Sequence, residues 1–222
     1  MRNLKIVLQV LLVLLCMISV MAAFLWMRCS IEGRRVTAEN MAPTLKTNEK
    51  VLFDMTRYRA GKSFARGQIV LFFPPATKIR PKDISRDPMS LLDKAFAPPS
   101  LHTPESSIKR VIGLPGDKIE VKDGVVYIND EKLSEPYIQE PPRYELHKLK
   151  DLGGELLSGG SIYPYPGQEE AIVVPPGHLF VLGDNRNNSQ DSHLWGFLDQ
   201  ERVLGKAILV FYPRLQIIQS PQ

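Results

Sequence analysis

At Lys109-Arg-Val-Ile-Gly-Leu-Pro-Gly-Asp117, an apolar strand begins with two adjacent cations and ends in a Pro-Gly turn. Apart from Lys109 and Arg110, the residues from Ile108 to Leu114 are apolar or glycine, which predicts a buried strand ending at Gly113. Most lysines are solvated, and Lys109 taken alone would be one of them. Burial among apolar walls would instead lower its pKa to about 8, so that Lys109 could act as a base.

Strand-like segments recur on both sides of this stretch and indicate an all-β domain. Lys122-Asp-Gly-Val125 is typical of a tight hairpin, because Asp-Gly readily adopts positive φ angles. Many short strands with little helical periodicity predict folded or coiled antiparallel sheets. The other predicted strands cover residues 50–54, 68–73, 118–122, 125–128, 178–182 and 206–212.

Two segments do not fit the strand pattern, about 74–107 and 141–167. The first is rich in proline and charge. The second contains Gly153-Gly154, Gly159-Gly160 and Pro164-Tyr-Pro166. Both are predicted to be long Pro/Gly-rich surface inserts, which in compact domains are usually functional or disordered.

The N-terminal segment predicts one transmembrane helix. Residues 6–27 carry no charge, and as a helix they would extend about 33 Å, enough to cross a hydrocarbon core of roughly 30 Å. The apolar run is too long for a cleavable signal peptide, and Met21-Ala-Ala23 before Phe24 makes a poor cleavage site. We expect an uncleaved anchor at residues 1–28 and a β domain at 29–222. Basic residues flank the run on both sides, so charge alone gives no orientation.

Composition argues against several classes of function. The net charge is +4, but the basic residues are scattered and not interleaved with aromatics, which argues against nucleic-acid binding. A mildly basic domain beside an anchor is better suited to anionic lipid. Cys16 lies in the apolar run and Cys29 at its edge, so no disulfide is expected within the β domain. No Cys/His spacing indicates a metal site, and no cofactor is expected.

Two polar segments far from Lys109 complete a pattern: Ala38-Glu-Asn-Met-Ala-Pro-Thr-Leu45 and Gly183-Asp-Asn-Arg-Asn-Asn-Ser-Gln-Asp-Ser-His-Leu-Trp-Gly196. In order and type, the three segments resemble the characteristic boxes of type I signal peptidases, the serine–lysine peptidases that remove signal peptides from exported proteins. Ser192-His-Leu-Trp-Gly-Phe197 and Tyr137-Ile-Gln-Glu-Pro-Pro142 are similar to the cyanobacterial and plastid subtype. The resemblance implies the signal peptidase I fold and signal peptides as substrates.

The resemblance also implies roles for individual residues. Lys109 matches the general base, and Ser189 matches the hydroxyl that orients its amine. Arg110 matches the arginine beside the base, and Asp184 matches the acid that pairs with it. The supporting positions in the third segment are Asn185, Arg186, Asp191 and His193, the last of which stands where many members have an arginine.

The first segment departs from the family. Met41 and Pro43 match, but the residue before that methionine is the nucleophilic serine in the family and is Asn40 here. Ala38 also lacks the hydroxyl that some members use in the oxyanion hole. An amide nitrogen is non-basic and its carbon is itself an electrophile. The resemblance therefore predicts a catalytically impaired or inactive chain that retains signal-peptide binding.

Arg66-Gly-Gln-Ile-Val-Leu-Phe-Phe-Pro74 resembles the apolar strand along the family's substrate cleft. An extended signal peptide is then expected to pair with this strand through its backbone. The alternative is an ordinary core strand. The implied groove residues are Ile69, Val70, Leu71 and Phe72.

Other hypotheses stay open. The chain could be an active signal peptidase with another nucleophile, an engineered Ser-to-Asn trap, or a non-catalytic docking subunit of a membrane complex. The expected partners are signal peptides, the lipid bilayer through residues 6–27 and possible membrane proteins. The resemblance places the chain as a single-pass protein of a plasma or thylakoid membrane, with the β domain on the periplasmic or lumenal side.

Overall fold

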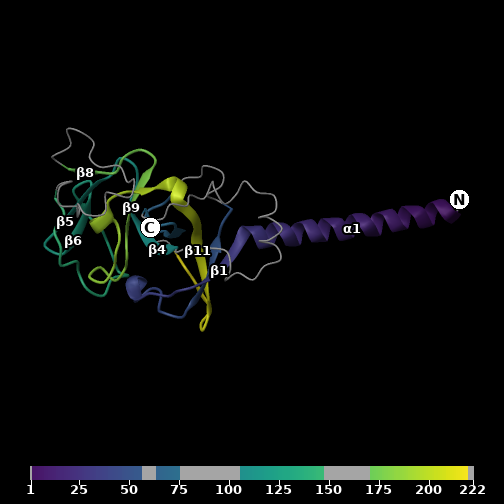
Figure 1. Cartoon of the computed structure of the whole chain (residues 1–222), viewed down its shortest axis with the longest axis horizontal. Coiled ribbons are helices and arrows are strands. Elements are labelled where there is room, and N and C mark those ends of the chain that lie inside the picture. Colours follow the sequence, from purple (N-terminus) through teal and green to yellow (C-terminus); the bar gives the residue numbers. More distant parts are fainter. Residues whose placement is uncertain (1, 57–63, 76–105, 148–170, 220–222) are drawn as a thin grey trace.

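A computed structural model of the chain shows a β domain that follows one long helix (Figure 1). It describes residues 2–56, 64–75, 106–147 and 171–219. The helix α1 spans Arg2–Ser30, and its section Ile6–Ala23 is long and apolar enough to cross a membrane. The apolar side chains of that section are exposed, so they do not pack on the domain. The helix begins and ends within two residues of the predicted anchor.

The larger sheet contains eight strands, and all of its pairings are antiparallel. Its order is β1-β2-β11-β3-β4-β9-β10, with β12 paired to β11. The central position of β4 carries the Lys109 stretch between β3 and β9. The strands are β1 (Ile31–Arg35), β2 (Lys50–Asp54), β3 (Ile69–Phe72), β4 (Ser107–Gly113), β9 (His178–Leu182), β10 (Leu198–Asp199), β11 (Val203–Tyr212) and β12 (Gln216–Ile217).

The smaller sheet has four antiparallel strands in the order β7-β6-β5-β8. The strands are β5 (Lys118–Lys122), β6 (Val125–Ile128), β7 (Glu131–Lys132) and β8 (Ile172–Val173). The predicted Asp-Gly hairpin joins β5 to β6, and Asp123 and Gly124 have φ angles of 52° and 74°. These two positive angles suit the right-handed twist of the flanking strands.

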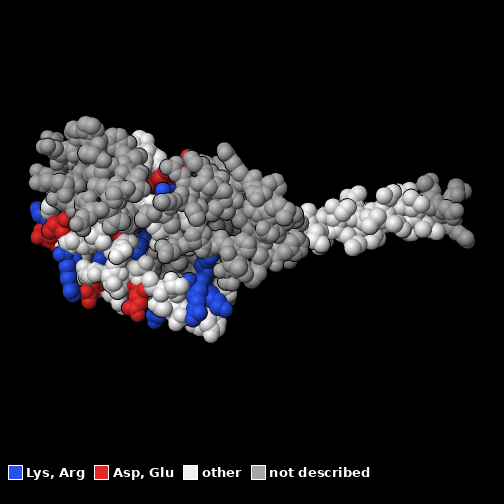
Figure 2. Space-filling view, viewed as in Figure 1, with Lys and Arg blue, Asp and Glu red and all other residues white. Residues whose placement is uncertain are grey.

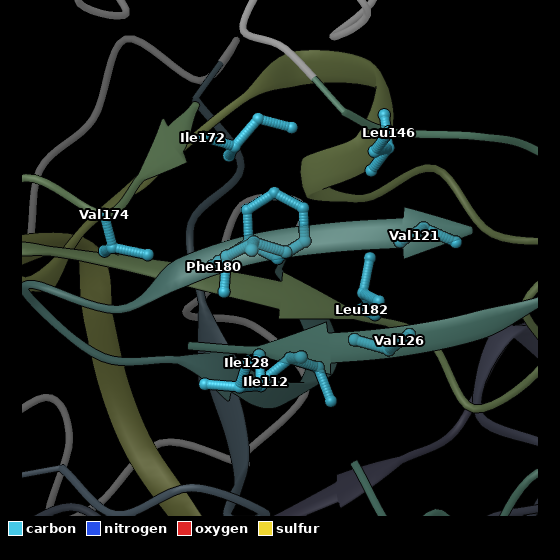
Figure 3. Packing of buried hydrophobic residues seen from close by; sticks show 10 residues of the cluster. Ile112, Val121, Val126, Ile128, Leu146, Ile172, Val174, Phe180 and Leu182 are labelled. Atoms are coloured by element: carbon cyan, nitrogen blue, oxygen red, sulfur yellow. The ribbon is translucent and has the colours of Figure 1, made fainter. Parts of the chain in front are cut away.

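One apolar core joins the two sheets (Figure 3). Strands β4 and β9 of the larger sheet contribute Ile112, Phe180 and Leu182, and these side chains point toward the smaller sheet. The smaller sheet and its connections contribute Ile119, Val121, Val126, Ile128, Leu146, Ile172 and Val174. Because Arg110 and Ile112 lie on the same strand, this core also fixes the strand that carries the charged pair.

Three short helices complete the described part: η1 (Glu39–Met41), α4 (Ser192–Trp195) and η6 (Gln200–Arg202). The all-β prediction is confirmed, and every predicted strand is present. The second insert begins later than predicted, because Leu146 is buried and its backbone pairs with Val121. Ser107, placed in the first insert, is already part of β4. Most of both inserts lies outside the described residues.

Candidate active site

Strand β4 carries two cations side by side into the interior. The side chains of Lys109 and Arg110 are 1% and 2% exposed. Successive side chains of a strand point to opposite faces, so the two cations serve two different surroundings. A buried charge is stable only with a partner, and each of them has one.

The Lys109 amine faces a hydroxyl. Its Nζ donates to Ser189 Oγ across 2.7 Å. Burial lowers the pKa of Lys109 to about 8, and the nearby charges of Asp191 and Asp184 only partly oppose this effect. An amine with this pKa is partly neutral in mildly alkaline solution, where it can accept a proton from a neighbouring hydroxyl or water.

Arg110 makes the two-pronged ion pair that its planar guanidinium favours. Its Nε and Nη2 donate to the two carboxylate oxygens of Asp184 across 2.8 and 2.6 Å. Its Nη1 donates to the carbonyl of Gly67 across 2.8 Å, and the Tyr137 ring lies 3.9 Å from the guanidinium carbon. The pair therefore ties β4 to the segment that follows β9.

Asp191 organises the turn beyond β9. One of its oxygens accepts from the Gly183 amide across 2.8 Å. The other caps helix α4 by accepting from the His193 amide, and it lies 2.6 Å from His193 Nδ1. The His193 ring stacks on Tyr144 with centroids 4.2 Å apart. These contacts hold the imidazole against the wall of the site.

Gly183 is the point where the first and third segments meet. A Cβ atom at this position would lie 2.3 Å from Ser189 Oγ and 2.5 Å from the Asn40 carbonyl oxygen, closer than real Cβ contacts. The amide of Asn185 donates to that carbonyl across 3.1 Å. Helix η1 is thereby fixed beside the serine that contacts Lys109, and only glycine fits between them.

Arg186 has a partner that the sequence patterns did not reveal. The buried side chain of Glu135 accepts from both of its terminal nitrogens, one of them across 2.9 Å. Tyr137 donates its hydroxyl to the same carboxylate across 3.0 Å. Arg186 Nε also donates to the Gly183 carbonyl across 3.1 Å. Glu135 and Tyr144 stand near the Tyr-Ile-Gln-Glu-Pro-Pro motif, which was the only signal for this part of the site.

A groove of about 870 Å³ runs over these residues. Of the predicted residues, Ala38, Asn40, Phe72, Lys109, Ser189 and His193 line it, whereas Met41 is buried beneath it in the core. Pro43 and Asn185 lie outside the lining, and Arg110, Asp184, Arg186 and Asp191 support it from behind. The other lining residues are Glu39, Pro74, Pro75, Ser107, Asn187, Asn188, Gln190, Leu194 and Trp195.

The predicted pairing of a peptide with β3 is wrong. Strand β3 is hydrogen-bonded to β11 on one edge and to β4 on the other along its length, so its backbone offers a peptide no free edge. Ile69, Val70 and Leu71 are core residues, and of the four predicted groove residues Phe72 alone lines the groove. Among the described residues, no group of three or more His, Cys, Asp or Glu side chains is arranged to hold a metal ion.

Comparisons with known proteins found similar sequences and a similar solved structure. The family described as signal peptidase, peptidase S26, matches residues 7–212. A probable signal peptidase I-1 of Synechocystis sp. is 34% identical over 200 residues, which cover 90% of this chain and 80% of that protein. The signal peptidase I of Leptolyngbya laminosa is 34% identical over 182 residues, covering 82% and 69%. The solved signal peptidase I of Enterococcus faecalis is 27% identical, with a TM-score of 0.37 over 65% of this chain and 97% of that one.

Proposed function

Because this chain belongs to the signal peptidase family, peptidase S26, we propose that it binds signal peptides and cleaves them very slowly or not at all. In this proposal Lys109 occupies the place of the general base, Ser189 orients its amine, and Asn40 occupies the place of the nucleophilic serine. The proposal rests on one observation above all: Asn40 lines the groove that contains the 2.7 Å contact of Lys109 with Ser189.

In this proposal the surroundings of a nucleophile are present without the nucleophile itself. The amine is buried and its pKa is lowered, as base catalysis by lysine requires. The Asn40 amide offers no oxygen that a base could turn into an alkoxide. Loss of one member of such a unit lowers the rate by several powers of ten, and the rate that remains comes from binding and oxyanion stabilisation.

The edge of β4 suits an extended peptide better than β3 does. On its outer side β4 pairs with β9 as far as Arg110 and Leu182, where β9 ends. Backbone groups alternate in direction along a strand, so the N–H and C=O of Ile108 point to this outer side. Ser107 and Lys109 on either side line the groove. A signal peptide would add as a short antiparallel or parallel strand beside Ile108.

The helix α1 supports attachment to a membrane. Its described side chains carry no charge over Ile6–Ala23, as the white rod in Figure 2 shows, and none of them is buried in the domain. We include in the proposal a single-pass protein of a plasma or thylakoid membrane, with the β domain on the periplasmic or lumenal side. Signal peptides emerge on that side, within reach of a domain attached by α1.

The test is a comparison of cleavage and binding by the full-length chain in detergent micelles. We expect no cleavage above background of a peptide with small residues before its scissile bond, together with measurable binding. Asn40→Ser should raise turnover by roughly 10³-fold or more, and Asn40→Ser with Lys109→Ala should abolish that gain. Robust cleavage by the unmodified chain, or absence of binding, would overturn the proposal.

One observation favours a second candidate function, an active endopeptidase with Ser189 as nucleophile. Ser189 Oγ lines the groove and is within hydrogen-bond distance of Lys109. Thr44 is a poorer candidate, because its hydroxyl lies 3.4 Å from the Arg110 guanidinium. In this case the unmodified chain would cleave the peptide, and both Ser189→Ala and Lys109→Ala would stop cleavage. Loss with Lys109→Ala alone would exclude Ser189 as the nucleophile.

A further inference from the structure

The His193 ring lies between a carboxylate and an aromatic ring at the wall of the groove. Its Nδ1 is 2.6 Å from Asp191 Oδ1, and its face stacks on Tyr144 with an angle of 6° between the ring planes. The side chain is 13% exposed, and it lines the groove together with Lys109. The imidazole is therefore fixed at the edge of the groove that contains the Lys109 amine.

The partner of Nδ1 determines which nitrogen of this ring can change its charge. Asp191 is fully buried, and its oxygens also accept from the backbone amides of Gly183 and His193. An ionised carboxylate can only accept hydrogen bonds, so Nδ1 carries a proton in both charge states of the ring. Nε2 is then the atom that gains or loses a proton. Among the described residues, Nε2 has no hydrogen-bond partner.

The charge of Asp191 acts on Lys109. It favours the protonated amine and so raises the pKa of Lys109, in opposition to the larger effect of burial. Asp184 acts in the same sense, but its charge is neutralised by the ion pair with Arg110. In the described part of the chain, His193 is the one basic side chain in contact with Asp191. The effect of Asp191 on the amine therefore depends on the charge of His193.

The other groups around the imidazole do not supply a compensating charge. Burial raises the pKa of the Tyr144 hydroxyl, so the ring behind His193 stays neutral. Arg186 and Glu135, which lie near Tyr144, neutralise each other in a buried ion pair. On the groove side, Glu39 is exposed, and solvent and salt screen its charge.

We propose that the charge at position 193, acting through Asp191, determines how readily the Lys109 amine gives up its proton. A neutral imidazole leaves the charge of Asp191 unopposed, and the amine then keeps its proton to a higher pH. A permanent cation at this position would cancel that charge and release the proton at a lower pH. In this role His193 acts through Asp191, without contact with the scissile bond. The inference deepens the proposed function, in which Lys109 holds the place of the general base.

The experiment is competitive acetylation of the full chain in detergent micelles at a series of pH values, followed by peptide mass spectrometry. Only the neutral amine reacts, so the midpoint of the labelling curve of Lys109 measures its pKa. His193→Arg and His193→Gln both remove the stacked imidazole, and only the first carries a charge. We expect the midpoint for His193→Arg to lie roughly one pH unit below that for His193→Gln. His193→Gln should stay near the parent value of about 8, where an imidazole is largely neutral.

Two controls separate this effect from a general charge effect. Lys122, an exposed lysine at the end of β5, serves as an internal reference, and its labelling midpoint should be the same in every variant. His147→Arg places the same cation between two glutamates outside the groove lining, and should leave the midpoint of Lys109 unchanged. Equal shifts of that midpoint in His147→Arg and His193→Arg would overturn the inference.

The route through Asp191 is tested in an Asp191→Asn background, which keeps the shape of the side chain and removes its charge. There the difference between the two position-193 variants should fall to less than half. An undiminished difference would mean that the cation acts on the amine directly, contrary to the inference. The comparison of His193→Arg with His193→Gln stands on its own even where Asp191→Asn does not fold.

A second readout comes from cleavage in the Asn40→Ser background. The acid limb of kcat/KM against pH reports the base of the free enzyme. His193→Arg should move this limb roughly one unit lower than His193→Gln does, whereas loss of a purely structural contact would lower the rate at every pH. An Asn40→Ser chain that cleaves nothing contradicts the proposed function, and the labelling still tests this inference. Equal labelling midpoints for the two variants overturn this inference alone.

Discussion

At the scale of single residues, Lys109 combines a buried charge with a modest set of partners. The free energy lost on burying its charged form is about 3 kcal/mol, the equivalent of the pKa change from 10.5 to about 8. A lysine whose burial costs this much free energy is expected to serve a role other than stability. Proton transfer and anion binding are two roles that require a buried amine.

The first prediction follows from this penalty. Lys109→Met should be more stable than the parent by about 2 kcal/mol at pH 7, because the lost contact with Ser189 offsets part of the gain. In the parent, the folded state releases this proton near pH 8 and the unfolded state near 10.5, so between these values the unfolded state binds more protons. Raising the pH through this window therefore stabilises the parent.

Lys109→Met should be the more stable form by the largest margin below pH 8. Above about pH 10.5 the order should reverse, because the parent has by then gained about 3 kcal/mol and Lys109→Met still lacks the contact with Ser189. Urea unfolding in detergent micelles at a series of pH values, followed by tryptophan fluorescence, measures the two free energies of unfolding. The Lys122→Met variant serves as the control and should show no such pH-dependent gap. A gap for Lys109→Met that does not change with pH would contradict the prediction.

A second prediction concerns Gly183, where backbone and Ser189 leave no room for a side chain. Gly183→Ala should lower the free energy of unfolding by about 1–3 kcal/mol, as overpacking usually does. In the Asn40→Ser background it should also reduce peptide cleavage, because Ser189 and the η1 segment must separate. Thermal unfolding and a cleavage assay measure the two effects.

The matched control for this change is Gly33→Ala. A Cβ atom at Gly33 in β1 would meet its neighbours at 3.6 Å and beyond, which is ordinary contact. This variant should stay within about 0.5 kcal/mol of the parent. Equal destabilisation by both variants would show that the close approach at Gly183 is not the cause of the lower free energy of unfolding.

At the scale of elements, the segment of residues 133–146 holds the third polar segment in place. Glu135 pairs with Arg186, the Tyr137 ring covers Arg110, and Tyr144 stacks on His193. None of these three is in a described helix or strand. An irregular segment here acquires its order from buried charge pairs and ring contacts and not from a backbone ladder.

The third prediction tests this role of the segment. Glu135→Gln keeps the shape of the side chain but leaves Arg186 as a buried charge without an anionic partner, which should cost about 3–5 kcal/mol of stability. Glu140→Gln removes the acid from an exposed pair with Arg143, and should cost less than about 1 kcal/mol. Chemical unfolding of both variants decides the matter, and similar losses would contradict the prediction.

Sequence patterns predicted these elements unevenly, for physical reasons. Strands β2, β5 and β6 were predictable because local alternation and turn chemistry determine them, and β9 because it is a short apolar run. The neighbours of β3 were not, since strand order depends on contacts between distant segments, and the expected peptide edge was wrong for that reason. In the site, Lys109 and Ser189 were named from the family resemblance. Glu135 was missed because its contact with Arg186 spans 51 positions and has no local signal.

At the scale of the whole molecule, the chain consists of an exposed apolar helix followed by a β domain that has its own core. The core residues of the domain come from β strands and their connections, and among the side chains that the structure describes none comes from α1. Figure 2 shows charges of both signs interspersed on the visible face of the domain, while the helix section Ile6–Ala23 carries no charge. The helix surface therefore suits lipid, and the surface of the domain suits water.

The last prediction is that α1 alone makes the chain an integral membrane protein. Leu12 and Leu15 are 65% and 67% exposed in the middle of the apolar section, so they would face lipid. Replacing both with Lys should cost roughly 5–7 kcal/mol of insertion free energy, since each lysine at a helix centre costs about 2.5–3.5 kcal/mol. The parent should then stay in the membrane pellet during alkaline carbonate extraction, whereas the double variant should move to the soluble fraction with its β domain folded.

Leu215→Lys places the same kind of charge on a residue of the domain that is 79% exposed, and should leave the chain in the pellet. A double variant that also stays in the pellet would mean that the domain itself holds the membrane, and the division of the molecule into anchor and domain would have to be abandoned.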